Sequence, residues 1–284
     1  MNLHCTWREM MRDASQRLAA AGVENAPRDA RLLLALALGV EPVGVILRET
    51  DAIDPVQLDD YESLVQRRLA GEPVSRIRGW REFYSRRFIV TPDVLDPRPE
   101  TELLVAEGVK RLPQGGRVLD LGVGSGCILL SVLAERPDAS GVGVDISGPA
   151  LEVAKANAKA LSISRAGFML GGWDAPLEKF DLVLSNPPYI SEAELGGLAR
   201  DVRDYDPNIA LSPGAGAYAA YEAILAAMAA WLRPGGWIGF EFGLGQDAQL
   251  GGMMRTSGLE EVEMFEDLAG HTRAAFGRRP GSAV

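Results

Sequence analysis

Four residues, Asn186, Pro187, Pro188 and Tyr189, follow an apolar run in the segment DLVLSNPPYI. The apolar run predicts a buried strand, and the prolines must end it because proline cannot donate hydrogen bonds to a neighbouring strand. The Asn186 side-chain oxygen and the Pro187 carbonyl are two acceptors at fixed geometry, which suits an NH₂ group with two hydrogens. Tyr189 offers a flat face on which a planar amide or base can stack. The segment therefore predicts a site for an amide or amino group; the structural alternative is a plain Pro-Pro turn.

A planar NH₂ group is a poor nucleophile, because its lone pair is delocalised. Holding both hydrogens can favour a more tetrahedral nitrogen and direct its lone pair at a methyl group, so that catalysis rests on positioning and desolvation. Such a reaction needs neither a metal nor a covalent nucleophile. The chain has two histidines and two cysteines, without CxxC spacing, and we expect no metal site. We interpret His271 as structural rather than as a base.

A second candidate site is the glycine-rich segment LDLGVGSG, between a predicted strand and a predicted helix. Its members are Gly122, Val123, Gly124, Ser125 and Gly126. Glycines let the backbone approach a ligand closely and permit left-handed conformations. The spacing is G-x-G-x-G rather than the dinucleotide pattern G-x-G-x-x-G, and no Gly-Lys-Ser/Thr follows. Neither a pyrophosphate site nor a Walker loop is therefore predicted.

Asp145 lies 19 positions after Gly126, at the end of the next predicted strand. An acid at about that distance, ~20 residues, can accept hydrogen bonds from ribose hydroxyls. Loop and acid together predict a nucleoside site without a pyrophosphate, for which S-adenosylmethionine is the commonest cofactor; a tight turn with a solvated acid is the structural alternative. Trp173 follows the third predicted strand and could pack on adenine, although a single tryptophan is more often core or rim packing.

These candidates lie at the ends of predicted strands within residues 96–284. Strands and helices are predicted to alternate here, with strands at GRVLDLG, SGVGVDIS, AGFMLGG, FDLVLSN and WIGFEFG. One of the helices is predicted at residues 220–236. A final strand pair is expected at VEMFEDLAG and TRAAFGRR. Repeated β-α-β units favour an α/β fold with a mostly parallel sheet and helices on both faces. In such sheets the loops at the carboxyl ends of the strands line the ligand crevice.

Two further regions precede this one. Residues 1–76 predict a small helical bundle, in which Thr6 and Glu9 offer a capping box for the first helix. Residues 77–95 predict a β-hairpin linker with SRR, residues 85–87, as its turn. The spacing alone indicates a structural appendage for the helical region.

Composition limits the classes of function. The chain has 284 residues, 47% of them hydrophobic, and a net charge of −10, so a folded protein of two domains is expected. The acidic balance argues against stable nucleic-acid binding, which needs a basic face. The first residues lack a signal-peptide pattern, and the longest apolar runs are too short to span a bilayer. We expect a reduced, cytoplasmic monomer without membrane contacts.

The sequence closely resembles the HemK/PrmC family, the release-factor glutamine methyltransferases, over nearly the whole chain. The resemblance includes GEPVSRIRGWREFYSRRFIVTPDVLDPRPETELLV, VLDLGVGSG, GVDIS, DLVLSNPPYI, VRDYDPNIAL, LRPGGWIGFEFGLGQ and DLAGHTR. The segment NPPY alone does not decide, since amino-methyltransferases of DNA and RNA also carry it. The segment PRPETE is more specific to this family than NPPY.

The resemblance implies a Rossmann-like, seven-stranded class I methyltransferase sheet behind a small helical domain. It implies methyl transfer from S-adenosylmethionine to the glutamine of the Gly-Gly-Gln tripeptide in class I peptide release factors, which the helical domain would help hold. Gly122 to Gly126, Asp145, Trp173 and Asn186 would form the cofactor site. The substrate amide would meet Asn186, Pro187, Pro188 and Tyr189. Arg98, Glu100 and Thr101 would sit near the mouth of the site.

Three positions depart from the family pattern and leave the chemistry intact, and the Asp96 and Ala215 regions bear on substrate fit. Val123 replaces a threonine, Asp96 replaces an aliphatic residue, and the region around Ala215 lacks an acid-glycine pair. The alternatives are an amino-methyltransferase of adenine or cytosine in nucleic acid, a methyltransferase of another protein glutamine such as one in a ribosomal protein, and a scaffold that binds S-adenosylmethionine without turnover. The first predicts a basic groove that this acidic chain does not suggest.

Overall fold

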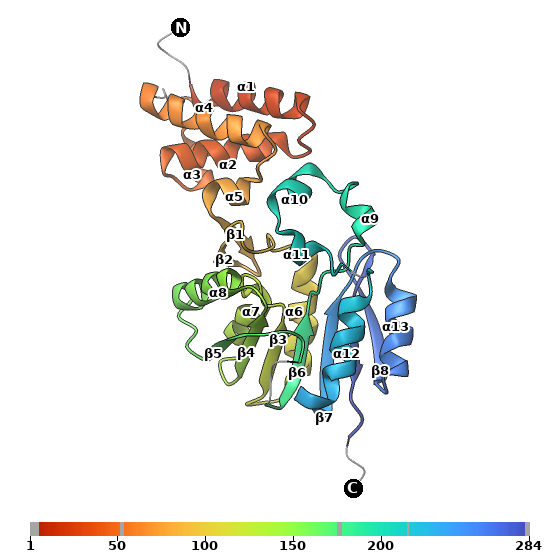
Figure 1. The fold of residues 1–284 in the computed structure, drawn as a ribbon. Helices are drawn as coiled ribbons and strands as arrows, with labels where there is room; N and C mark the ends of the chain where they lie inside the picture. Colours follow the sequence, from red (N-terminus) through yellow and green to blue (C-terminus); the bar gives the residue numbers. More distant parts are fainter. Residues whose placement is uncertain (1–5, 52–53, 175–177, 215, 282–284) are drawn as a thin grey trace. The chain divides into compact units, whose positions relative to one another are not determined.

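The computed structural model describes residues 6–51, 54–174, 178–214 and 216–281 (Figure 1). The chain divides into two compact units, Met1–Gly79 and Trp80–Val284. The finer division with a linker at residues 77–95 stays a prediction. Within the described residues, no helix combines the length and apolarity that crossing a bilayer requires.

The first unit is helical, as predicted. Its helices are α1 (Trp7–Ala20), α2 (Ala26–Leu38), α3 (Pro42–Leu47), α4 (Pro55–Leu69) and α5 (Val74–Arg78). The Thr6 hydroxyl accepts the Glu9 N–H while the Glu9 carboxylate accepts the Thr6 N–H, so the capping box at α1 is confirmed. The apolar faces of α1, α2 and α4 pack together in a core that includes Trp7, Leu33 and Tyr61.

The second unit begins with a hairpin of β1 (Trp80–Phe83) and β2 (Arg86–Ile89), paired antiparallel. The prediction of a turn at residues 85–87 is wrong by one position. The turn residues are Tyr84 and Ser85, with φ of 48° and 58°, and Arg86 already belongs to β2. Two residues with positive φ give a turn whose twist matches that of the flanking strands.

The centre of the second unit is a seven-stranded sheet, which confirms the predicted fold class (Figure 1). Its strands are β3 (Arg117–Leu121), β4 (Ser140–Asp145), β5 (Ala166–Leu170), β6 (Phe180–Ser185), β7 (Leu232–Glu241), β8 (Glu260–Glu266) and β9 (Thr272–Arg278). The order is β5-β4-β3-β6-β7-β9-β8; β3 to β7 pair in parallel, and β9 is antiparallel to β7 and β8. The carboxyl ends of the parallel strands therefore meet at one edge.

Helices cover both faces of the sheet. One apolar cluster joins α6 (Glu102–Arg111), α7 (Cys127–Glu135) and α8 (Gly148–Ala160) to the sheet, and another joins α12 (Ala219–Trp231) and α13 (Asp247–Thr256). The 3₁₀ helix η1 (Pro99–Thr101) leads into α6. Between β6 and α12 lie the short helices α9 (Glu192–Leu195), α10 (Arg200–Tyr205) and α11 (Asn208–Leu211).

The prediction of a helix through residues 220–236 is wrong at its end. The helix stops at Trp231, and residues 232–236 already belong to β7. Pro234 cannot continue a helix. The pairing with β6 jumps from Phe180–Leu232 to Leu182–Trp237, so the extra residues form a bulge in the strand.

Candidate functional site

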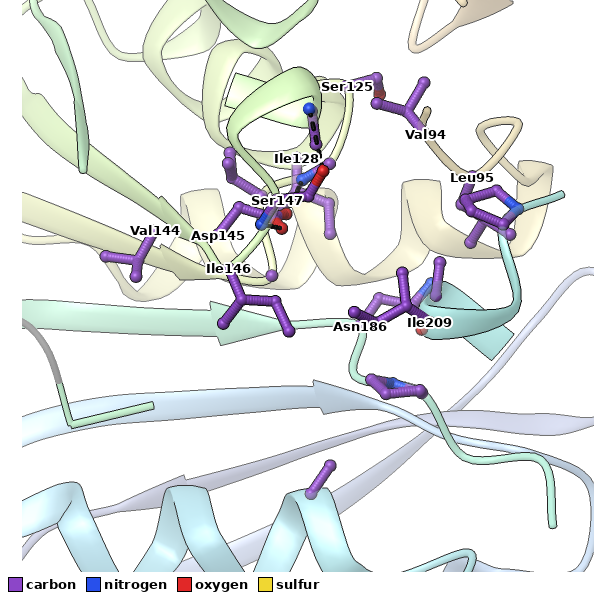
Figure 2. Close-up of a pocket in the computed structure, with 18 of the residues that line it drawn as sticks. Val94, Leu95, Ser125, Ile128, Val144, Asp145, Ile146, Ser147, Asn186 and Ile209 are labelled. Atoms are coloured by element: carbon purple, nitrogen blue, oxygen red, sulfur yellow. Dashed lines mark hydrogen bonds between the residues drawn. The ribbon is translucent and has the colours of Figure 1, made fainter. Parts of the chain in front are cut away.

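A cavity of about 310 Å³ opens at the carboxyl edge of the parallel strands, entirely within the second unit (Figure 2). Its wall comes from the loops after β3, β4, β5 and β6, from residues within 93–101 and 207–213, and from the start of α12. Small-molecule sites commonly measure about 300–1,000 Å³. The sequence predicted this edge because parallel strands place their carboxyl ends together.

The glycine loop forms one side of the cavity. The N–H groups of Gly122 and Val123 both donate to the Val144 carbonyl at 2.9 Å, which fastens the loop to β4. Gly122, Gly124 and Gly126 have φ of 77°, 50° and 82°, a region that other residues rarely adopt. Val123 is buried, and a Cβ placed on Gly143 would lie 2.5 Å from its Cγ2. The side chain that replaces the family's threonine therefore packs on β4.

Asp145 lies against this loop (Figure 2). Its Oδ2 accepts the N–H of Gly124 and its Oδ1 accepts the N–H of Ser147, both at 2.9 Å. Each carboxylate oxygen can accept a further hydrogen bond. The side chain is partly exposed and lines the cavity. The arrangement can therefore hold two neighbouring hydroxyl groups of a ribose.

Apolar side chains supply the rest of this end of the cavity. Trp173 lines it, with ring atoms 3.6 Å from a Cβ position on Gly122, and its carbonyl accepts the Trp231 indole N–H at 3.0 Å. Sequence reasoning missed Ile146, which follows Asp145, lines the cavity and is 57% exposed. An aliphatic residue directly after the acid, at the carboxyl end of a predicted strand, was the available signal, since such a side chain can pack on a planar base.

Asn186, the first residue after β6, lines the cavity together with Pro188 (Figure 2). Its Nδ2 donates to the Thr101 hydroxyl at 3.4 Å, across 85 residues of sequence. Pro187 is buried, and neither it nor Tyr189 contributes to the cavity wall. Tyr189 is largely buried, which raises the pKa of its phenol, and its carbonyl accepts from Gln246 at 3.1 Å. Catalytic and substrate roles for these residues stay predictions.

The PRPETE segment borders the same cavity through Arg98 and Thr101, whereas Glu100 lies outside its wall. Arg98 donates to the Asp206 carboxylate at 2.5 Å, and Asp206 also accepts the Asp96 N–H at 3.2 Å. Asp96 is buried and pairs with Arg81 at 3.3 Å. The acid that departs from the family pattern thus joins an ion pair that ties the hairpin to this segment. Ala215 lies outside the described residues.

Sequence reasoning missed two buried acids at this edge of the sheet, Asp120 in β3 and Glu241 in β7. Burial raises the pKa of each carboxyl to about 7. The Leu129 N–H, donated at 3.1 Å, lowers the pKa of Asp120, and the nearby Asp145 charge raises it. Thr101 lowers the pKa of Glu241 by hydrogen bonding, the charge of Glu100 raises it, and Arg273 and Asn186 lower it.

Cysteine and histidine side chains form no second site within the part of the chain that the structure describes. Burial raises the pKa of the Cys127 thiol to about 12, which keeps it protonated. His271 lies outside the cavity wall, and its backbone N–H donates to Asp267 at 3.0 Å. Across the described residues, no cluster of three His, Cys, Asp or Glu side chains could hold a metal ion. His4 and Cys5 lie outside those residues.

Two family models match the chain. The PrmC N-terminal domain matches residues 9–79, and the methyltransferase small domain matches residues 92–199. The second match contains the glycine loop, Asp145, Trp173 and Asn186.

Full-length relatives are also found. The Release factor glutamine methyltransferase of Cereibacter sphaeroides is 44% identical over 96% of this chain and 99% of its own length. That of Rhodospirillum rubrum is 44% identical over 93% of this chain and 82% of its own length, and that of Nitratidesulfovibrio vulgaris is 40% identical over 97% and 96%.

Solved methyltransferase structures share the fold over about two thirds of this chain. The hMettl16 catalytic domain, crystallised with a MAT2A 3'UTR hairpin, aligns with a TM-score of 0.54 at 16% identity, over 69% of this chain and 77% of that chain. A methyltransferase from Pyrococcus furiosus aligns with a TM-score of 0.51 at 14% identity, over 68% of this chain and 88% of that chain.

Proposed function

This chain belongs to the family of release factor glutamine methyltransferases, and on that premise we propose that it methylates the glutamine side chain in the Gly-Gly-Gln motif of class I peptide chain release factors. The methyl donor would be S-adenosylmethionine. The observation that carries the proposal is the position of Asn186, on the wall of the cavity that Asp145 and the glycine loop also line. The activity would take place in the cytoplasm, where release factors act.

The residues around the cavity fit this methyl donor. Gly122 to Gly126 bring backbone close to the ligand, Asp145 keeps acceptor capacity for ribose hydroxyls, and Ile146 and Trp173 offer apolar surface for an adenine. When bound, S-adenosylmethionine would supply an electrophilic methyl group from its sulfonium sulfur, and the amide nitrogen that gains this methyl would release one proton to solvent.

The chain's own residues would bind and orient the acceptor amide. We propose that the Asn186 Oδ1 and the Pro187 carbonyl accept the two amide hydrogens, because both are acceptors on a rigid strand end. Pro188 and Tyr189 would exclude water from the amide, and Arg98, Glu100 and Thr101 would frame the entrance. The helical unit would bind parts of the release factor other than its Gly-Gly-Gln motif.

Peptide mass spectrometry tests this proposal. Purified class I release factor is incubated with S-adenosylmethionine and the protein, and the Gly-Gly-Gln fragment is analysed. We expect a gain of one methyl group on the glutamine, and a loss of turnover of at least about 100-fold in Asn186→Ala, because a fixed acceptor is removed. Calorimetry on the same variant should still detect S-adenosylmethionine binding.

Three results would contradict the proposal. Unchanged turnover in Asn186→Ala would remove the strand end from the chemistry. Methylation of duplex DNA or RNA, with retention that falls steeply with salt, would favour the amino-methyltransferase of nucleic acid instead. Methylation of a ribosomal protein glutamine but not of the release factor would keep the chemistry and replace the substrate.

A further inference from the structure

We infer that Thr101 and Glu241 are positioning residues that fix which end of the Asn186 side-chain amide faces the substrate. The inference rests on the proposed function, because that function needs the Asn186 Oδ1, and not its Nδ2, toward the acceptor amide. A flipped Asn186 would direct an N–H donor at the N–H donors of the substrate, and no hydrogen bond could form. Orienting this amide is therefore a requirement of the site.

Strand register brings the three side chains together. In the parallel pair β6–β7, Ser185 lies opposite Phe240. The next residues along the chain are Asn186, the first residue after β6, and Glu241, the last residue of β7. Thr101 reaches the same point from η1. Thr101 and Glu241 are 2% and 3% exposed, respectively, whereas Asn186 and Thr101 also line the cavity. Glu241 thus lies behind the cavity wall and does not need to touch the substrate.

The direction of the hydrogen bonds follows from what each group can offer. The Asn186 Nδ2 donates to the Thr101 Oγ1 at 3.4 Å. A threonine hydroxyl that accepts in this way still has one hydrogen to donate, and a buried carboxylate is a strong acceptor. Thr101 and Asn186 both act on Glu241 by hydrogen bonding, and its buried Oε2 has no hydrogen-bond partner among the described residues. Hydrogen bonds that run from Asn186 to Thr101 and from Thr101 to Glu241 leave the Asn186 Oδ1 free to accept from the substrate.

The protonation state of Glu241 determines the direction of these hydrogen bonds. A neutral Glu241 is a weaker acceptor and can itself donate to Thr101, so the Thr101 hydroxyl hydrogen is no longer held on the carboxylate and its oxygen is no longer fixed toward the Asn186 Nδ2. The groups around Glu241 are Glu100 on η1, Arg273 on β9 and Tyr189 after β6, with Tyr221 on α12 and Cys127 on α7 near enough to feel its charge. Together with burial they give a pKa of about 7. Turnover should therefore rise with pH through about 7.

Three variants test the assignment: Thr101→Val, Thr101→Ser and Glu241→Gln. Thr101→Val keeps the shape and loses the hydroxyl. We expect its kcat to fall about 10- to 100-fold, while KM for the release factor and Kd for S-adenosylmethionine change less than about twofold. Thr101→Ser should restore most of the lost kcat. Glu241→Gln should lose the rise of kcat through pH 7.

The double variant and a spectroscopic signal separate this role from a general structural one. Because the two residues act in one chain, Thr101→Val/Glu241→Gln should be no worse than the poorer single variant. In NMR spectra, the cross-peaks of the Asn186 side-chain NH₂ are assigned by their absence in Asn186→Ala. They should shift in Thr101→Val and in Glu241→Gln, and in the wild type they should titrate with a midpoint near pH 7.

Several outcomes would overturn the inference. These are unchanged kcat in Thr101→Val, equal losses of kcat and cofactor affinity, additive losses in the double variant, or an Asn186 signal that ignores both substitutions. The NMR readout does not require turnover. A wild type that fails to methylate the release factor would therefore refute the proposed function, while the cross-peaks would still decide the orientation of Asn186.

Discussion

Asp120 makes the stability of this protein depend on pH in a direction opposite to that of most carboxylates. Its side chain is fully buried in β3, its Oδ2 accepts one N–H from Leu129, and its Oδ1 has no hydrogen-bond partner among the described residues. A single hydrogen bond does not replace hydration of a charge, so burial raises the pKa to about 7. The folded protein holds this proton more tightly than the unfolded chain. The stabilisation is fully present below the unfolded pKa and is lost as pH rises through about 7.

The size of the effect follows from the two pKa values. With 3.8 for the unfolded chain and about 7 for the folded protein, Asp120 lowers the free energy of unfolding by about 2 to 3 kcal/mol between pH 5 and pH 8. Glu241 adds a contribution of the same sign, because burial raises its pKa as well. Asp120→Asn removes the first contribution and keeps the oxygen that accepts the Leu129 N–H.

Guanidinium denaturation at pH 5, 6, 7 and 8 measures this dependence. We expect Asp120→Asn to be less stable than the wild type at pH 5, because its buried NH₂ gains no partner, and to lose about 2 to 3 kcal/mol less between pH 5 and pH 8. Glu222→Gln, an exposed acid on α12, is the control and should keep the wild-type slope. Equal slopes in Asp120→Asn and the wild type would refute the reasoning.

Two other predictions concern the cofactor and the sheet. Asp145→Ala should weaken S-adenosylmethionine binding by about 10- to 100-fold in calorimetry, since the ribose acceptors and an anchor of the glycine loop are lost together; Asp93→Ala, on the same cavity wall, should change affinity much less, and equal losses would count against the ribose role. Gly239→Ala should cost about 1 to 3 kcal/mol of unfolding free energy, because its Cβ would lie 2.4 Å from the Phe276 ring. Gly252→Ala, an exposed position in α13 with nothing within 4 Å, should instead stabilise by about 0.5 to 1 kcal/mol, and similar values for both alanines would contradict the packing argument.

The fold and half of the site could be predicted because they depend on local patterns. Alternating strands and helices fix a parallel sheet, and a parallel sheet brings its carboxyl ends to one edge. The sequence therefore predicts that Asp145 and Asn186 lie beside the glycine loop, and both line its cavity. The predictions are wrong at boundaries: the hairpin turn lies at Tyr84 and Ser85, and the helix predicted through residue 236 ends at Trp231, before Pro234.

The rest of the site could not be predicted because it depends on contacts between distant segments. Asp120 and Glu241 sit inside apolar strands, and nothing local distinguishes a buried acid from a solvated one at a strand end. Thr101 and Asn186 are 85 residues apart, and their contact exists only because α6 packs on the sheet beside β6.

The same physical reason explains why the sheet contains both buried acids, Asp120 and Glu241. Each lies at a strand end that leads into the site, Asp120 two residues before the glycine loop and Glu241 beside Asn186. Asp120 accepts the Leu129 N–H in the helix that follows the loop, and Glu241 accepts from Thr101 and Asn186. Replacing either by an apolar residue would remove a desolvation cost and would also remove the acceptor that orients its neighbour. A carboxyl with a pKa of about 7 stays partly protonated near neutral pH, so its cost to the fold is reduced while its oxygen remains an acceptor. The sheet can therefore keep an acid in its core at the two points where the site needs an oriented backbone or amide.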